Sequence, residues 1–146
     1  MMNSWFRFWW YWLVIAITLG LAMVGLGLVV IPDFINSVLQ EIFFSTSQAQ
    51  ASFNEVANSY VKFFFGVLGG VMIAWSVALL FILAGPFRRG QKEAWYAVTV
   101  SILIWVIVDS SASIATGYWQ NAVSNTIFLV FLGAPLVATY RDFFKS

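Results

Sequence analysis

One carboxylate lies inside an otherwise apolar stretch, and its position suggests chemistry more strongly than that of any other side chain in the sequence. In ILIWVIVDSSASIATG, residues 102–117, Asp109 follows seven apolar residues and precedes a run of small hydroxyl residues. A charged side chain that faces lipid inside a membrane helix is costly, so it should face protein or water instead. Asp109 is therefore the first candidate functional residue.

Polar residues on the same helix and on the next one could surround this carboxylate. Trp105 and Ser113 stand four residues before and after Asp109, so a helix places all three on one face. Asn121 and Asn125 begin the next apolar helix after a short turn, which predicts that they lie at a similar depth and donate hydrogen bonds to Asp109. Two interpretations stay open: an outward-opening polar pocket, or a structural clasp between the two helices.

Two residues from the preceding helix could complete this site. Lys62 is the only cation on the predicted outer side and could be a counter-charge for Asp109, although Glu55 is nearer to Lys62 in sequence. Trp75 could join Trp105 in forming the floor of a pocket. The predicted ligand-binding residues are Trp75, Trp105, Asp109, Ser113, Asn121, Asn125 and Lys62.

The composition indicates that these helices lie in a bilayer. Of the 146 residues, 62% are hydrophobic and 9% are charged, whereas charged residues make up roughly 25% of a soluble domain. A span of hydrocarbon needs roughly 20 helical residues, and four apolar runs are long enough, at about 9–31, 60–84, 94–116 and 122–140. The sequence therefore predicts an all-α polytopic membrane protein, a four-transmembrane-helix bundle forming a single membrane domain over residues 1–146. We expect the first run to be a retained helix and not a signal peptide, because its apolar stretch is too long.

The distribution of basic residues predicts the orientation of the bundle. Arg7, Arg88, Arg89, Lys92, Arg141 and Lys145 fall on one side, and Lys62 alone falls on the other. Positive residues mark the cytoplasmic side of a membrane. Both termini and the loop at 85–93 should thus be cytoplasmic, in the inner membrane of a cell, and the loop at 32–59 should lie outside.

The outer loop itself has an amphipathic pattern. Its segment PDFINSVLQEIFF, residues 32–44, places its apolar residues on one helical face, with Asp33 as a plausible N-cap. This pattern predicts a short helix at the outer membrane interface or folded back over the bundle. The spacing of SFNE, residues 52–55, is that of a capping box, so the second long helix could begin before the membrane.

Several other features suggest how the helices pack. Gly66, Gly70 and Ala74 form a stripe of small residues that should let another helix approach closely, either in this chain or in an oligomer. Pro135 should kink the last helix. The aromatic stretch WFRFWWYW, residues 5–12, is typical of an interfacial belt, and it could also dock a partner protein, a pigment or a lipid. The basic loop after the second long helix should determine topology, or contact an anionic lipid headgroup.

The residues present also exclude some chemistry. The chain contains no cysteine and no histidine, which excludes disulfides, thiolate nucleophiles, imidazole bases and the usual zinc sites. A net charge of +1 offers no case for nucleic acid as a partner. One intramembrane carboxylate could act as a general acid or base, but no second titratable group accompanies it. We therefore expect no cofactor, no metal and no catalytic residue, and regard an enzyme as the least favoured class.

The sequence resembles the small bacterial membrane proteins grouped as DoxX-like. The resemblance rests on GLVVIPDF at the end of the first helix, on FGVLGGVMIAWSV, on PFRRGQKEAWYAV, and on IWVIVDSSASIATGYWQNAVSNTIFLVFLGAPL. It covers most of the chain outside residues 40–58. It implies a four-helix membrane bundle and adds little about activity.

Two functions follow as hypotheses. The first is a non-catalytic accessory or structural subunit packed into a larger membrane complex, with membrane lipids and other membrane-protein subunits as partners. The second is a membrane binding or transport module that holds a lipid, quinone or other apolar small molecule at an outward-facing pocket around Asp109.

Overall fold

The computed structural model describes residues 3–43 and 54–144, which are helical except at short connections and form no strand. The first long helix consists of α1 (Ser4–Ile17), a π-helical segment η1 (Thr18–Met23) and α2 (Val24–Val30). The shorter α3 (Pro32–Phe43) follows it. The second long helix is α5 (Glu55–Ile82) with its π-helical end η2 (Leu83–Phe87), and then come α6 (Lys92–Ala115) and α7 (Trp119–Phe144). The predicted all-α class is confirmed.

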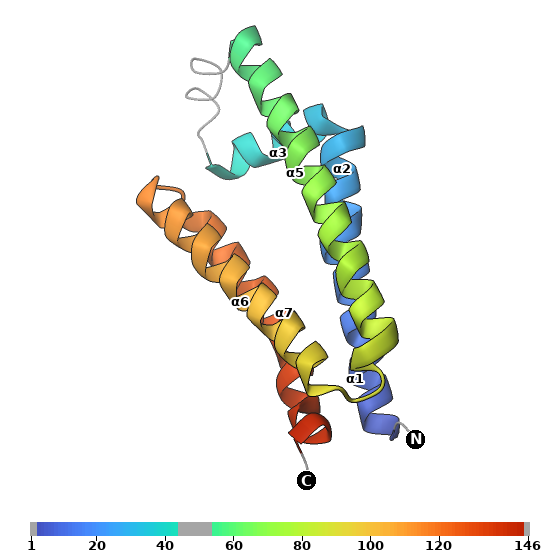
Figure 1. Ribbon diagram of the computed structural model, residues 1–146. Coiled ribbons are helices and arrows are strands. Elements are labelled where there is room, and N and C mark those ends of the chain that lie inside the picture. Colours follow the sequence, from blue (N-terminus) through green and yellow to red (C-terminus); the bar gives the residue numbers. More distant parts are fainter. Residues whose placement is uncertain (1–2, 44–53, 145–146) are drawn as a thin grey trace.

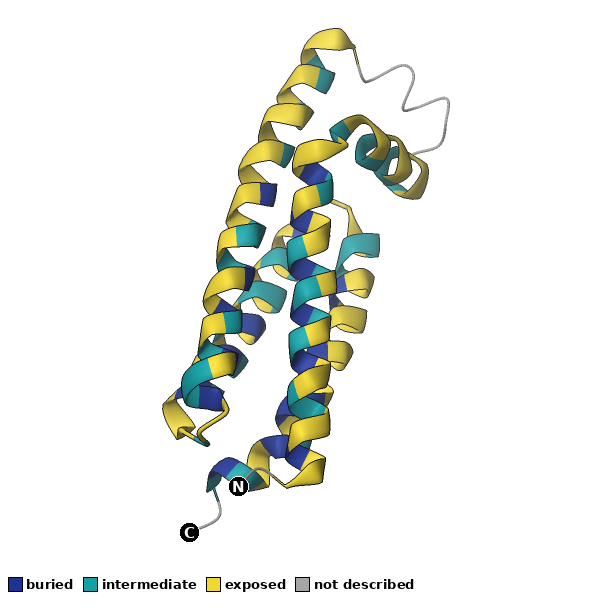
Figure 2. Cartoon of the chain, turned by 90° about the vertical axis from the view of Figure 1, so that its right-hand side faces the viewer, coloured by how far each residue is buried: buried dark blue, intermediate teal, exposed yellow. Residues whose placement is uncertain are grey.

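Four helices are long and apolar enough to cross a membrane, namely Ser4–Val30, Glu55–Phe87, Lys92–Ala115 and Trp119–Phe144. Between 17% and 28% of the most apolar window of each is buried inside the protein. Most of their apolar surface therefore faces outward, as the yellow ribbon in Figure 2 shows. Such a surface would be unstable in water and suits lipid, so the chain is a multi-pass membrane protein.

The long helices form two antiparallel pairs, α2 with α5 and α6 with α7, while α1 packs against α7. Figure 1 shows the pairs close together at the end that holds both termini and diverging toward the opposite end. Helix α3 turns back at that opposite end, where it contacts α2 and α5. The expected amphipathic helix in the first outer loop is thus present. It begins at Pro32, so Asp33 lies in its first turn and is not its N-cap.

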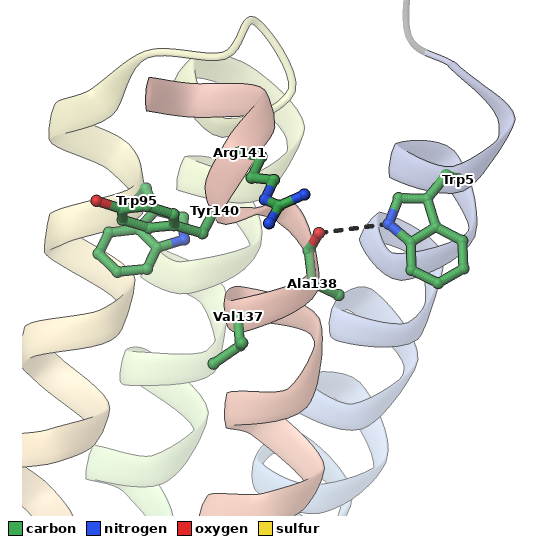
Figure 3. Close-up of a pocket in the computed structure, with 6 residues that line it drawn as sticks. All are labelled: Trp5, Trp95, Val137, Ala138, Tyr140 and Arg141. Carbon is green, nitrogen blue, oxygen red and sulfur yellow. Dashed lines mark hydrogen bonds between the residues drawn. The ribbon is translucent and has the colours of Figure 1, made fainter. Parts of the chain in front are cut away.

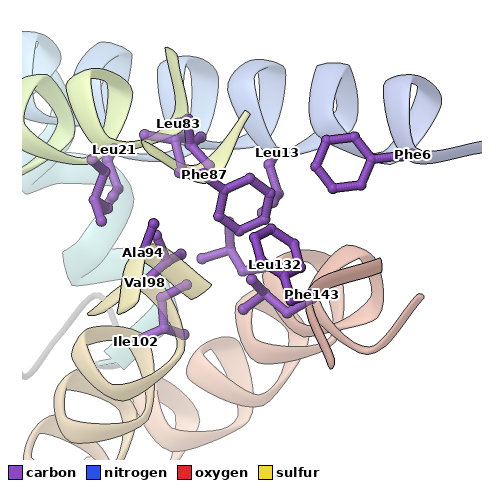
Figure 4. Close-up of a cluster of buried hydrophobic side chains, with 13 residues drawn as sticks. Phe6, Leu13, Leu21, Leu83, Phe87, Ala94, Val98, Ile102, Leu132 and Phe143 are labelled. Carbon is purple, nitrogen blue, oxygen red and sulfur yellow. The ribbon is translucent and has the colours of Figure 1, made fainter. Parts of the chain in front are cut away.

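The hydrophobic core lies where the two pairs meet, toward the termini. Figure 4 shows side chains from the four long helices converging there. Phe87 is fully buried, with ring centroids 4.7 Å from Phe143 and 6.0 Å from Phe6. These rings join η2, α7 and α1. Because the core is at this end, the opposite end is held by fewer contacts, and it is there that the candidate site is found.

Close packing between α2 and α5 involves a glycine of α5 other than the expected Gly66 and Gly70. A Cβ added to Gly69 would lie 2.5 Å from the carbonyl oxygen of Gly25, and one added to Gly25 would lie 2.9 Å from that of Gly69. Each glycine therefore lets the other backbone approach. By contrast, Gly66, Gly70 and Ala74 are exposed, and an added Cβ at Gly66 or Gly70 would meet nothing within 4 Å. The predicted stripe does not pack inside this chain.

Helix α7 continues through Pro135, and a tryptophan compensates for the hydrogen bond that proline cannot make. Proline has no N–H, so the carbonyl four residues earlier, that of Phe131, lacks its usual helical donor. Trp12 Nε1 donates to this carbonyl over 3.0 Å. The indoles of Trp5 and Trp10 likewise donate to backbone carbonyls of α7 and η2. The aromatic stretch thus serves packing within the chain.

The N-terminus of α5 lies before the predicted apolar run at 60–84. It starts at Glu55, and the side chain of Asn54 accepts a hydrogen bond from the backbone N–H of Ala57. Asn54 is therefore the N-cap, and the predicted capping-box serine at 52 lies outside the described residues.

Candidate functional site

The turn between α6 and α7 sets the relative position of the candidate residues. Helix α6 ends with Gly117 at φ +87°, a left-handed conformation that glycine adopts without strain. The N–H of Tyr118 donates to the carbonyl of Ser113, and that of Gly117 to Ile114. This is a Schellman motif. It reverses the chain within a few residues, so the first turns of α7 lie beside the last turns of α6.

Two asparagines of α7 hold the carboxylate of Asp109. Asn121 Nδ2 donates to Asp109 Oδ2 over 2.8 Å, and Asn125 Nδ2 donates to the same oxygen over 2.6 Å. Asn125 is buried, with 3% of its surface exposed. Hydrogen bonds from two amide donors compensate part of the cost of placing a carboxylate in a membrane helix. The predicted pairing of Asp109 with both asparagines is thus present.

Two serines of α6 extend this network. Asn121 Nδ2 also donates to Ser113 Oγ over 2.8 Å, and Ser113 Oγ donates to the backbone carbonyl of Asp109 over 2.7 Å. Asn125 Nδ2 also lies 3.1 Å from Ser110 Oγ. Ser110 was not predicted, because it directly follows Asp109 and does not share its face. Ser110 belongs to the site because one side chain of α7, that of Asn125, contacts both Asp109 and the residue after it on α6. We call Asp109, Ser110, Ser113, Asn121 and Asn125 the polar cluster.

Lys62 has a different partner from the one considered. Its Nζ lies 2.7 Å from Asp33 Oδ1 in the first turn of α3, and both side chains are largely exposed. The pair links α5 to α3 and takes Lys62 away from the role of counter-charge for Asp109. Sequence distance alone could not show this, because Asp33 becomes a neighbour only when α3 folds back.

An aromatic contact lies beneath the polar cluster, toward the core. The rings of Trp75 on α5 and Trp105 on α6 meet edge to face with centroids 5.9 Å apart. Trp105 also contacts Phe128 of α7, at 6.3 Å. The structure therefore brings together the two predicted floor residues. They connect α5 with the α6–α7 pair at the depth where the two helix pairs begin to diverge.

Above the polar cluster is a cavity of about 390 Å³ between α3 and the α6–α7 turn. It is lined by Asn36, Leu39, Gln40, Phe43, Val61, Ser113, Tyr118 and Asn121. Phe43 and Tyr118 meet edge to face at 5.7 Å across it. Of the predicted residues, Ser113 and Asn121 line the cavity, and each is hydrogen-bonded to Asp109, which does not line it. The contribution of α3 was not predicted, because only the fold brings this helix over the cluster.

Within residues 3–43 and 54–144, no three acidic, histidine or cysteine side chains gather where they could hold a metal. No protein-family model matches the chain, and neither a curated protein nor a solved structure matches it. The fold and the polar cluster therefore define the class by themselves. The protein is a small four-helix integral membrane protein with a hydrogen-bonded carboxylate inside its third span.

Proposed function

We propose that the protein binds an amphipathic small molecule, a lipid, a quinol or another apolar molecule with a hydroxyl group, in the cavity between α3 and the α6–α7 turn. The observation that carries this proposal is that the cavity ends on Asn121 and Ser113, the two residues that connect it to Asp109. We propose further that this cavity opens on the outer side of a cell inner membrane, since the basic residues gather at the other end.

The lining suits a ligand of this kind. Leu39, Phe43 and Val61 supply an apolar wall, while Asn121 and Ser113 supply a polar end. Ligand sites combine such walls with a few placed polar groups that orient the ligand. A molecule with an apolar body and one polar group would therefore bind in one direction, with the polar group toward the cluster.

The hydrogen bonds indicate which polar group fits. The amide nitrogen of Asn121 already donates to Asp109 and Ser113, so both of its protons are engaged. What Asn121 offers a ligand is its carbonyl oxygen, which accepts. A ligand that donates, such as an alcohol, phenol or quinol, is favoured over one that only accepts.

Helix α3 is the element best placed to admit the ligand. None of its residues is buried, and it is joined to α5 by the exposed Lys62–Asp33 pair and by one hydrogen bond, from Asn36 Nδ2 to Asn58 Oδ1. Exposed pairs contribute about 0–1 kcal/mol, and segments with few buried contacts open at low cost. Helix α3 could therefore move away from the cavity without disturbing the core.

Native mass spectrometry of protein extracted gently with its surrounding lipid tests this function. A defined small adduct should remain on the protein, and Val61→Phe, which fills the cavity, should remove it. Val67→Phe is the matched control, because Val67 is an exposed residue of the same helix. An adduct that survives Val61→Phe would refute binding in this cavity.

An accessory-subunit function has one specific observation in its favour. Gly66, Gly70 and Ala74 are exposed on α5 with open space beside both glycines, so a helix of another membrane protein could approach closely there. We infer that such a partner would be lost on Gly70→Leu, and that Gly133→Leu on α7 would retain it. Extraction that yields the chain alone, without other polypeptides, would contradict this function. The resemblance to DoxX-like proteins is compatible with either function.

A further inference from the structure

The end of the bundle that holds the termini carries a second site, independent of the proposed function. We propose that one anionic phospholipid binds there, with its headgroup against Arg141 and an acyl chain along the groove between α6 and α7. Three features of two adjacent cavities support this: a cation without an ion pair in the first, and an unpartnered hydroxyl and an open glycine in the second.

The headgroup end is a cavity of about 530 Å³ lined by Trp5, Trp95, Val137, Ala138, Tyr140 and Arg141. In Figure 3 the guanidinium of Arg141 lies between Trp95 and Tyr140 on one side and Trp5 on the other. Both indoles are engaged, because Trp5 Nε1 donates to Ala138 and Trp95 Nε1 to Leu136. The donors that this cavity offers to a ligand are thus the guanidinium of Arg141 and the hydroxyl of Tyr140, and only the first is charged.

Arg141, like Arg7 and Arg89, has no ion pair or cation–π contact among the described residues, and of these three it is the one that lines this cavity. Arg88 lies 5.3 Å from the ring centre of Trp10, and Lys92 lies 5.6 Å from that of Phe144. The neighbouring Asp142 accepts from Asn3. Across residues 3–43 and 54–144, the one ion pair joins Lys62 to Asp33. An arginine without an anionic partner, among aromatic rings at a membrane interface, complements a phosphate group.

The acyl-chain end is a second cavity of about 330 Å³ between α6 and α7. It shares Trp95 and Val137 with the first, so the two cavities are adjacent. An added Cβ at Gly133 would meet nothing within 4 Å, which leaves the groove open at that point. Gly133 stands eight residues from Arg141, or roughly 12 Å along the helix axis, a reach that suits an acyl chain and not a headgroup.

Thr99 provides a polar group within the second cavity. It lines the groove one helical turn from Trp95, and its buried Oγ1 has no hydrogen-bond partner. A buried hydroxyl without a partner is destabilising, so an acceptor is expected beside it. A phospholipid has one, the ester carbonyl between its phosphate and its acyl chain. A cation in the first cavity, and a hydroxyl with apolar side chains in the adjacent one, therefore match the groups of a phospholipid.

The test is competition between two lipids on the purified full chain. The protein is equilibrated with vesicles of equal parts phosphatidylglycerol and phosphatidylcholine with identical acyl chains, and retained lipid is identified by native mass spectrometry. We expect one phosphatidylglycerol to be retained preferentially. Arg141→Gln should lower that preference about fivefold, the equivalent of about 1 kcal/mol for one basic residue at an anionic surface. Gly133→Leu should lower retention of both lipids, because it fills the groove.

Two matched controls and one structural check accompany these variants. Arg7→Gln removes an exposed arginine near the same end without touching either cavity, and Gly66→Leu adds the same side chain on an open face of α5. Neither should change retention, and helical circular dichroism should be the same for all four. Equal retention of the two lipids by the wild-type chain would overturn the proposal. So would a loss in Arg7→Gln equal to that in Arg141→Gln, or a second copy of the chain in place of a lipid.

Discussion

The substitution Asn125→Ala should destabilise the protein measurably, because Asn125 is the most deeply buried member of the polar cluster. It removes the hydrogen bonds to Asp109 Oδ2 at 2.6 Å and to Ser110 Oγ at 3.1 Å. Interhelical hydrogen bonds in membranes contribute about 0.6 kcal/mol on average, and one to a charged group contributes about 1.5–3 kcal/mol. These two energies bracket the expected effect of the substitution, a loss of about 1–3 kcal/mol in the free energy of unfolding.

The assay is unfolding of the protein in mixed micelles with increasing dodecyl sulfate, followed by helical circular dichroism. Ser124→Ala is the control, since Ser124 precedes Asn125 on α7, is exposed, and donates only within its own helix, to the carbonyl of Gln120. Both variants place alanine in the same helix, so the gain in helix propensity is similar. The reasoning is refuted if Asn125→Ala costs no more than Ser124→Ala.

A companion variant separates charge from hydrogen bonding. Asp109→Asn keeps an oxygen that can accept from both asparagines, so it should cost less than Asn125→Ala in the same titration. If it costs more, the negative charge itself stabilises the cluster. If binding of the adduct is lost while the fold is kept, Asp109 acts on the ligand through Asn121.

The remaining predictions concern packing and use the same titration. Gly69→Ala should cost about 1–3 kcal/mol of stability, because its Cβ would lie 2.5 Å from a carbonyl oxygen of α2. Its control, Gly70→Ala, should be neutral or stabilising by about 0.5–1 kcal/mol. Equal effects of the two substitutions would contradict this packing. Trp12→Phe should cost about 0.5–1.5 kcal/mol for the hydrogen bond it loses, and less in a Pro135→Ala background that restores a helical donor, so additive losses would contradict the compensation. Lys62→Ala should cost about 0–1 kcal/mol and less at high salt, because its ion pair is exposed; a salt-independent loss would show another role.

Much of the candidate site could be predicted because its residues are close in sequence. Asp109, Ser113, Asn121 and Asn125 lie on two helices joined by a short turn, so helical spacing and a shared depth brought them together before any tertiary contact was known. The partners that could not be predicted come from farther along the chain. Asp33 became the partner of Lys62 only because α3 folds back beside α5.

The four membrane spans and the pairing of the intramembrane carboxylate with its asparagines were determined by the sequence itself. Hydrocarbon admits only helices whose backbone bonds are satisfied, so length and apolarity decide the spans. The tertiary structure decided which glycine of α5 packs against α2. Any of Gly66, Gly69 and Gly70 is small enough to permit close approach, and only the rotation of α5 about its axis turns Gly69 toward α2. It also decided that the helix pairs diverge and that α3 covers the space above Asn121. Cavities depend on the distances between helices, and those distances are set by contacts among residues far apart in the chain.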